Sequence, residues 1–182
     1  MSDRIVDAIP PELSRPFHLA EFADSPEHKI QIVTTVAERA ALAARYSLLS
    51  LDALEAQLTL RSEVSGEIVV NGHLRAELAQ QCIVTLEPVI ETVSAPFEQR
   101  YALQPAALVA DLEFGPEDME PPEPVVGDSI DLGELVAQHL SLSINPYPRA
   151  PDAENQTDQY RSNAPDDGPF AALANLREPD RN

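Results

Sequence analysis

Strict alternation of apolar and polar residues is the feature that most constrains the fold of this chain. Four apolar residues alternate with polar ones between residues 54 and 61, and the same period continues from 68 to 78: Leu54, Ala56, Leu58 and Leu60, then Ile68, Val70, Leu74, Ala76 and Leu78. A period of two puts neighbouring side chains on opposite faces of a strand, so one face is buried and the other is solvated. The pattern predicts long antiparallel strands at the centre of the fold.

The Asn71-Gly72 pair lies inside this alternation without changing its phase. Asn-Gly is typical of a two-residue hairpin turn, but the alternation runs straight through it. We therefore expect one long strand with a bend or bulge at Gly72, and a second hairpin is the alternative. The next extended stretch, 89–103, contains Pro96, which cannot donate to a sheet ladder, so an edge strand or a broken strand is expected there.

Two segments begin with helix-start signals. Thr35 and Glu38 have the spacing of a capping box, as do Asp131 and Glu134, and apolar residues follow each pair at helical spacing. Together with the strands, these helices predict the α+β class. We expect an antiparallel sheet of long strands, open or closed into a barrel, with two main capped helices and a proline-rich acidic C-terminal region.

The composition changes near residue 104. The part of the chain after it holds 16 acidic residues, four basic residues and 11 of the 17 prolines. Such a composition buries too little apolar surface to offset the entropy of ordering. The predicted organisation is an N-terminal tail (1–14), a single α+β domain (15–148) with a mobile acidic loop (about 111–127), and a largely disordered tail (149–182).

A short apolar helix is predicted within that tail, over residues 169–177. Phe170, Leu173 and Leu176 recur at i, i+3 and i+6, which places them on one side of a two-turn helix. One interpretation is that these three residues bind a partner by inserting into a groove. The other is that the helix folds back onto the protein's own sheet.

The formal net charge of −19, from 31 acidic and 12 basic residues, bears on the choice of partner. Binding to a phosphate backbone depends on Lys and Arg, and a strongly acidic chain is repelled by it. Charge thus favours a basic protein as partner, and does not indicate direct RNA contact, although a local arginine cluster leaves it open. We find no apolar run that could span a membrane and no signal-peptide pattern, so we expect a cytoplasmic protein.

Metal and cysteine chemistry have little support in the sequence. The single cysteine, Cys82, has no cationic neighbour in sequence to activate it, which favours a buried structural thiol. The histidines show no metal-ligand spacing, and His139 is expected on the surface of its helix: His18, His28, His73 and His139. We expect no metal ion, no cofactor and no catalytic residue.

The enzymatic alternative is a metal-dependent hydrolase that processes RNA. It would need paired carboxylates to bind Mg²⁺, and the candidates are Asp111, Glu113, Asp128 and Asp131. Their proline-rich context offers little of the rigidity that a catalytic site requires. The sequence therefore favours a protein that is not an enzyme.

Several short motifs follow one another in a distinctive order. Cys82-x-x-Thr85-Leu86-Glu87-Pro88 comes first, Asp131-Leu132 opens a helix, and Phe170, Leu173 and Leu176 come last. This succession, over residues 15–177, resembles the bacterial and plastid family called large ribosomal RNA subunit accumulation protein, or YceD-type. The resemblance implies a non-enzymatic factor for maturation or accumulation of large-subunit ribosomal RNA. Its partner would be a ribosomal protein or the pre-ribosomal large subunit, and a dedicated chaperone of one basic ribosomal protein is a variant of this role.

One position departs from the family pattern. Many members have a second cysteine three residues after the first, where this chain has Thr85. A metal ion held by such a pair cannot be bound in the same way here. We therefore favour a structural turn at 82–88, in which the Thr85 hydroxyl and the Glu87 carboxylate bond to backbone N–H groups, over a ligand-binding turn.

Overall fold

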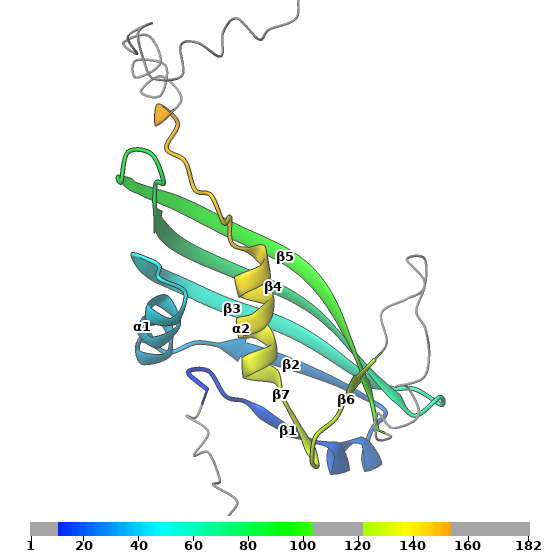
Figure 1. Cartoon of the computed structure of the whole chain (residues 1–182). Helices are drawn as coiled ribbons and strands as arrows, with labels where there is room; N and C mark the ends of the chain where they lie inside the picture. Colours follow the sequence, from blue (N-terminus) through cyan, green and yellow to red (C-terminus); the bar gives the residue numbers. More distant parts are fainter. Residues whose placement is uncertain (1–10, 104–121, 154–182) are drawn as a thin grey trace, which may run out of the picture. The chain divides into compact units, whose positions relative to one another are not determined.

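A computed structural model describes residues 11–103 and 122–153, and it has the predicted α+β architecture (Figure 1). Its long strands and two helices occur in the expected order. The elements are β1 (Pro16–His18), the 3-10 helix η1 (Leu19–Ala23), β2 (Glu27–Val33), α1 (Val36–Arg45), β3 (Ser50–Ser62), β4 (Glu67–Gln81), β5 (Pro88–Ala102), β6 (Glu123–Pro124), β7 (Ser129–Asp131) and α2 (Leu132–Ser143).

The large sheet has five strands in the order β2-β3-β4-β5-β6, and it is open. Of the two predicted forms, the closed barrel is therefore wrong. Strand β3 pairs antiparallel with both β2 and β4. Beyond β4, the only strand beside β5 in the described residues is β6, which pairs with it at two positions, so most of β5 is a sheet edge. An edge is where Pro96 is tolerated, because its missing N–H is not needed there.

Strand β4 runs unbroken through Asn71 and Gly72. The register with β3 passes from Thr59–Asn71 to Leu58–Gly72 without a shift, so both the alternative hairpin and a bulge at Gly72 are wrong. A different requirement explains the glycine. A Cβ atom at Gly72 would overlap Cζ of Phe97 on β5, so only glycine leaves room for that ring.

The predicted capping box is complete at α1, whereas at α2 the N-cap is present and the Glu134 carboxylate pairs with Arg45 instead of closing the box. The Thr35 hydroxyl accepts a hydrogen bond from the Glu38 N–H (3.3 Å), and the Glu38 carboxylate accepts one from the Thr35 N–H (2.7 Å). At α2, the Asp131 carboxylate accepts from the N–H groups of Gly133 and Glu134. The short strands β6 and β7 were not predicted, since two or three residues are too few to show a period.

The described residues form two compact units, one from within Met1–Gln80 and Ile90–Pro146 and the other from within Gln81–Val89 and Tyr147–Asn182. In the first unit, α2 lies across one face of the sheet (Figure 1). The alternating apolar residues of β3 and β4 and the apolar stripe of α2 are buried together: Leu54, Ala56, Leu58, Leu60, Ile68, Val70, Leu74, Ala76, Leu78, Leu132, Leu135, Val136 and Leu140. The predicted alternation therefore identifies the buried face correctly.

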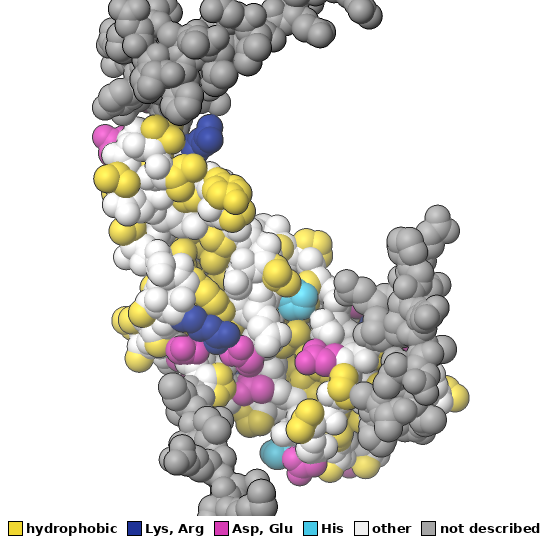
Figure 2. Space-filling view, in the orientation of Figure 1, with side chains coloured by type: hydrophobic (Ala, Val, Ile, Leu, Met, Phe, Trp, Pro, Cys, Tyr) yellow, Lys and Arg dark blue, Asp and Glu magenta, His cyan; other side chains and the backbone are white. Residues whose placement is uncertain are grey.

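The small sheet joins the start of the described chain to the start of α2. Strands β1 and β7 pair antiparallel, with Phe17 opposite Ile130, and both side chains are buried. Leu13, just before β1, is also fully buried. On the face that carries α2, Figure 2 shows basic side chains close to acidic ones, and ion pairs there join Arg45 to Glu12 and to Glu134.

Candidate functional site

The Cys82 turn, residues 82–88, connects β4 to β5 and belongs to the second unit. Two backbone hydrogen bonds close it, from the Cys82 N–H to the Glu87 carbonyl (2.8 Å) and from the Leu86 N–H to the Cys82 carbonyl (3.0 Å). The Cys82 sulfur is fully buried and accepts three N–H groups, those of Val84 (3.4 Å), Thr85 (3.3 Å) and Ala150 (3.3 Å). The sulfur thus joins the turn to the chain segment at residue 150.

These hydrogen bonds change the acidity of the thiol. Burial raises the pKa of Cys82, but the Thr85 hydroxyl and the N–H groups of Thr85, Ala150 and Val84 outweigh burial and lower the pKa from 9.0 to about 6. A thiolate at this position is an acceptor for the three N–H donors. The thiol is buried, as the sequence predicts, whereas its lowered pKa was not predicted, because it comes from backbone donors rather than from a neighbouring cation.

Replacing Cys82 with alanine is expected to destabilise the turn in a pH-dependent way. Because the folded-state pKa lies below the ordinary value, the thiolate contributes its full stability above pH 9, and this contribution falls as the pH is lowered towards 6. We expect the melting temperature of the wild type to exceed that of Cys82→Ala by more at pH 9 than at pH 6. An equal difference at both pH values, measured by circular dichroism, would show that the folded protein holds a neutral thiol.

The other turn residues have separate roles. Oγ1 of Thr85 accepts the Glu87 N–H (3.4 Å), as expected for the Thr85 hydroxyl. No hydrogen bond of the Glu87 carboxylate is found among the described residues, so the bond predicted for it is absent there.

Leu86 has a positive φ of 63° and is 65% exposed, and Ile83 (46%) and Val84 (39%) are exposed beside it. Pro88 is exposed and begins β5. The turn therefore presents apolar side chains around a buried sulfur.

Asp131 is a structural residue at the junction of α2 with the segment before β1. Its carboxylate accepts four hydrogen bonds, from the N–H groups of Arg15 (2.8 Å), Gly133 (2.9 Å) and Glu134 (3.2 Å) and from the Ser14 hydroxyl (2.6 Å). Partial burial raises the pKa of Asp131, but these hydrogen bonds outweigh burial and hold the pKa below its usual value. With its oxygens occupied in this way, Asp131 is not free to bind Mg²⁺.

The remaining predicted residues divide into two groups. Leu132 is buried, and its N–H bonds to the Arg15 carbonyl (3.0 Å), which extends the same junction. Asp128 is exposed. Among the described residues, no group of three or more His, Cys, Asp or Glu is placed to hold a metal ion. The other candidates lie outside the described residues: Asp111, Glu113, Phe170, Leu173 and Leu176.

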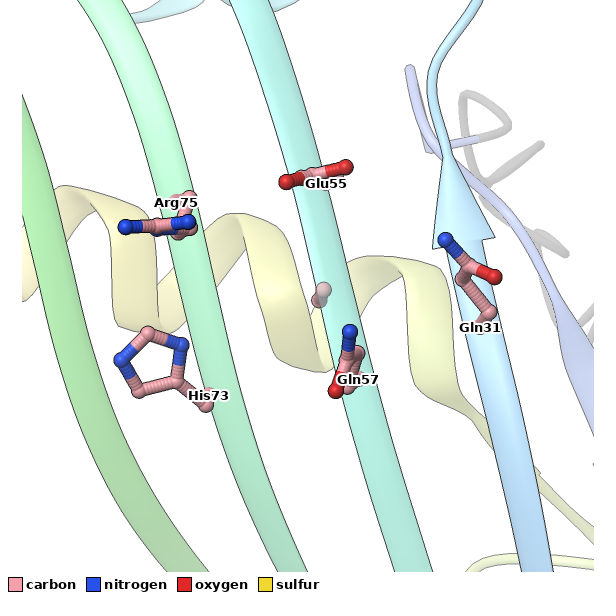
Figure 3. A pocket seen from close by; sticks show the side chains of 6 residues that line it. Gln31, Glu55, Gln57, His73 and Arg75 are labelled. Carbon is pink, nitrogen blue, oxygen red and sulfur yellow. The ribbon is translucent and has the colours of Figure 1, made fainter.

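A hollow on the polar face of the sheet is the feature that sequence reasoning missed. On the side of the sheet away from α2, a row of uncharged polar residues crosses adjacent strands (Figure 3). Gln31, Gln57 and His73 are register partners, and the Ser94 hydroxyl of β5 lies 3.2 Å from Nε2 of His73. In the next row, Val33, Glu55 and Arg75 are register partners. We call these two rows, with Glu77 and Thr92 beyond them, the polar sheet face.

The polar sheet face is hollowed rather than flat. Side chains of three neighbouring strands surround a depression of about 210 Å³ (Figure 3): Gln31, Glu55, Gln57, His73 and Arg75, with Ala56 at its base. A second depression, of about 370 Å³, shares Glu55 and Arg75 with the first and so adjoins it. The alternation that predicts this face polar gives no sign of the hollow, which depends on how the strands twist.

Comparison with known proteins gives the family. The family model described as "Large ribosomal RNA subunit accumulation protein YceD" matches residues 70–177, which is more than half of the chain. The chain belongs to the YceD family. No curated protein and no solved structure matches it.

The YceD match includes the Cys82 turn, the Asp131 junction and the predicted tail motif. It begins at Val70, so β2, α1 and β3 lie outside the matched residues. In this YceD-family protein, Thr85 occupies the position where many relatives have the second cysteine, and its N–H donates to the Cys82 sulfur. None of the helices in the described ranges has the length and apolar character needed to cross a membrane.

Proposed function

We propose that this protein is a non-enzymatic, cytoplasmic factor needed for the maturation or accumulation of large-subunit ribosomal RNA. The observation that carries the proposal is the YceD family match over residues 70–177. The protein would act through contacts with a ribosomal protein or with the pre-ribosomal large subunit. Direct contact with RNA is not required by the proposal.

The chemistry of the described residues supports a role in binding. The two groups with the most reactive side chains, Cys82 and Asp131, are both engaged by several donors that fix the backbone. A nucleophile or metal ligand needs its reacting atom open to substrate, whereas the Cys82 sulfur is buried and the partly buried Asp131 carboxylate already accepts four hydrogen bonds. The hydrolase alternative therefore loses Asp131, one of its four candidates.

Charge supports the choice of partner. At −19, the chain attracts basic proteins over long range and speeds their encounter at low salt. The exposed side chains of Ile83, Val84 and Leu86 offer an apolar contact on the Cys82 turn, which the hydrogen bonds to sulfur hold in one shape. A chaperone of one basic ribosomal protein is the most specific form of this function.

The partner can be tested by affinity capture of the tagged full-length protein from lysate at low and at high salt. We expect large-subunit ribosomal proteins or pre-ribosomal particles to be recovered at low salt and to be reduced at high salt, since screening weakens charge attraction. Recovery of no ribosomal component under either condition would contradict the proposal.

A further inference from the structure

We propose that the polar sheet face binds an extended segment of a basic polypeptide. This inference rests on the proposed function, because it names the class of partner and the surface that receives it. Its evidence is the shape, the unused hydrogen-bonding groups and the charge of that face.

The shape of the face suits a chain that lies along it. The two adjoining depressions reach from Gln31 on β2, across β3 and β4, to Thr92 on β5, and Arg39 of α1 also lines the second depression. Figure 3 shows α2 behind the sheet, so the hollow is open on the side where the labelled side chains project. A chain of several residues can therefore be accommodated without moving a helix.

The hydrogen-bonding groups of the face match an extended backbone. The side chains of Gln31 and Gln57 make no hydrogen bond within the described residues, and they lie side by side in register. Each amide offers one acceptor oxygen and two donor hydrogens. An extended peptide presents unpaired N–H and C=O groups that need such partners, whereas a helix satisfies its own. The amide row thus favours an extended segment over a helix.

The charge of the face favours basic side chains on that segment. Glu55 and Glu77 make no ion pair or hydrogen bond within the described residues, although Arg75 is the register partner of Glu55 and lies two positions before Glu77 on β4. Arg75 is also without an ion pair there. The second depression is lined by three carboxylates, of Asp52, Glu55 and Glu77, and by two guanidinium groups, of Arg39 and Arg75, so acidic groups are in excess by one. Added to the net charge of −19, this excess favours Lys and Arg over phosphate.

The same observations argue against RNA on this face. Proteins that bind single-stranded RNA on a sheet stack bases on aromatic side chains. The rings of β5, Phe97 and Tyr101, are packed against the hydrophobic core instead. The polar sheet face, as defined by its described residues, offers no Phe, Tyr or Trp. RNA binding is therefore an outcome that the test must be able to detect.

The test measures binding of two fluorescent probes to the full-length protein by anisotropy at low salt. One probe is a 16-residue peptide that repeats Arg-Gly-Lys-Ser, and the other is a 16-nucleotide uridine RNA. We expect the peptide to bind the wild type.

Replacing Glu55 and Glu77 together with Gln should weaken peptide binding about threefold to tenfold, because two exposed charge pairs are lost. Arg75→Gln should strengthen it, since a repelling charge is removed.

A matched control separates this surface from general attraction. Asp24 and Asp128 are exposed and make no side-chain hydrogen bond or ion pair among the described residues, and changing both to Asn alters the net charge by the same amount. We expect this control to change peptide binding by less than about twofold. Gln31→Ala with Gln57→Ala should weaken binding without any change in charge.

Three outcomes would overturn the inference. They are no binding of the peptide, equal weakening by the Asp24 and Asp128 control, and tighter binding of the RNA than of the peptide. The readout does not depend on ribosomal RNA levels. If the peptide binds as expected but cells lacking the protein keep normal levels of large-subunit ribosomal RNA, only the proposed function is contradicted. If the peptide does not bind but those cells lose large-subunit ribosomal RNA, only this inference is contradicted.

Discussion

Replacing Asp131 with alanine is expected to lower the free energy of unfolding by about 3 kcal/mol. Loss of a helix N-cap costs about 1 kcal/mol, and stranding further donors at a partly buried position costs about 1–3 kcal/mol more. The stranded groups are the Arg15 N–H and the Ser14 hydroxyl, which hold the start of the described chain against α2. Urea unfolding followed by circular dichroism measures the change.

Asp131→Asn is the matched variant. Its remaining oxygen can still accept the N–H groups of Gly133, Glu134 and Arg15, and its amide can donate to the Ser14 hydroxyl. We expect it to cost about 1 kcal/mol, well below the alanine variant. If alanine and asparagine were equally stable, the carboxylate would not be organising this junction.

Replacing Gly72 with alanine is expected to cost about 2 kcal/mol, although alanine is ordinarily the better residue in a strand interior. The new methyl group would overlap the Phe97 ring, whose centroid lies 4.0 Å from that of the stacked His139 ring on α2. The ring has a helix residue on its other side and cannot simply move away.

A double-mutant cycle checks this cause. In a Phe97→Ala background the clash is gone, so we expect Gly72→Ala to cost little or nothing there. The same cost in both backgrounds would mean that Gly72 is needed for its backbone conformation rather than for the room it leaves.

The sequence predicts the buried half of this fold well, because its signals are local. The alternation at Leu58 and Leu74 and the capping pairs at Thr35 and Asp131 each depend on neighbours within four residues. The use of Gly72 could not be predicted, since it depends on Phe97, 25 positions away. His139, expected on the helix surface, is half-buried against Phe97, and burial lowers its pKa.

For the candidate site, too, local features could be predicted from the sequence, whereas contacts between distant residues could not. A buried thiol at Cys82 could be predicted from the absence of a neighbouring cation, but the third N–H donor to its sulfur, from Ala150, comes from a segment 68 positions later. The polar sheet face is readable as polar from residues such as Gln57 and Arg75. That their side chains surround a hollow depends on strand order and twist, which no period in the sequence specifies.

If this YceD-family protein serves the accumulation of large-subunit ribosomal RNA, as we propose, its loss must change the balance of ribosomal subunits. The most direct measurement is a sucrose-gradient profile of ribosomal subunits from cells that lack the protein, with the same cells expressing the wild-type chain as control. We predict a selective deficit of large subunits and their RNA, restored by the wild type. A profile in which the large and small subunits keep their normal proportion would contradict the account.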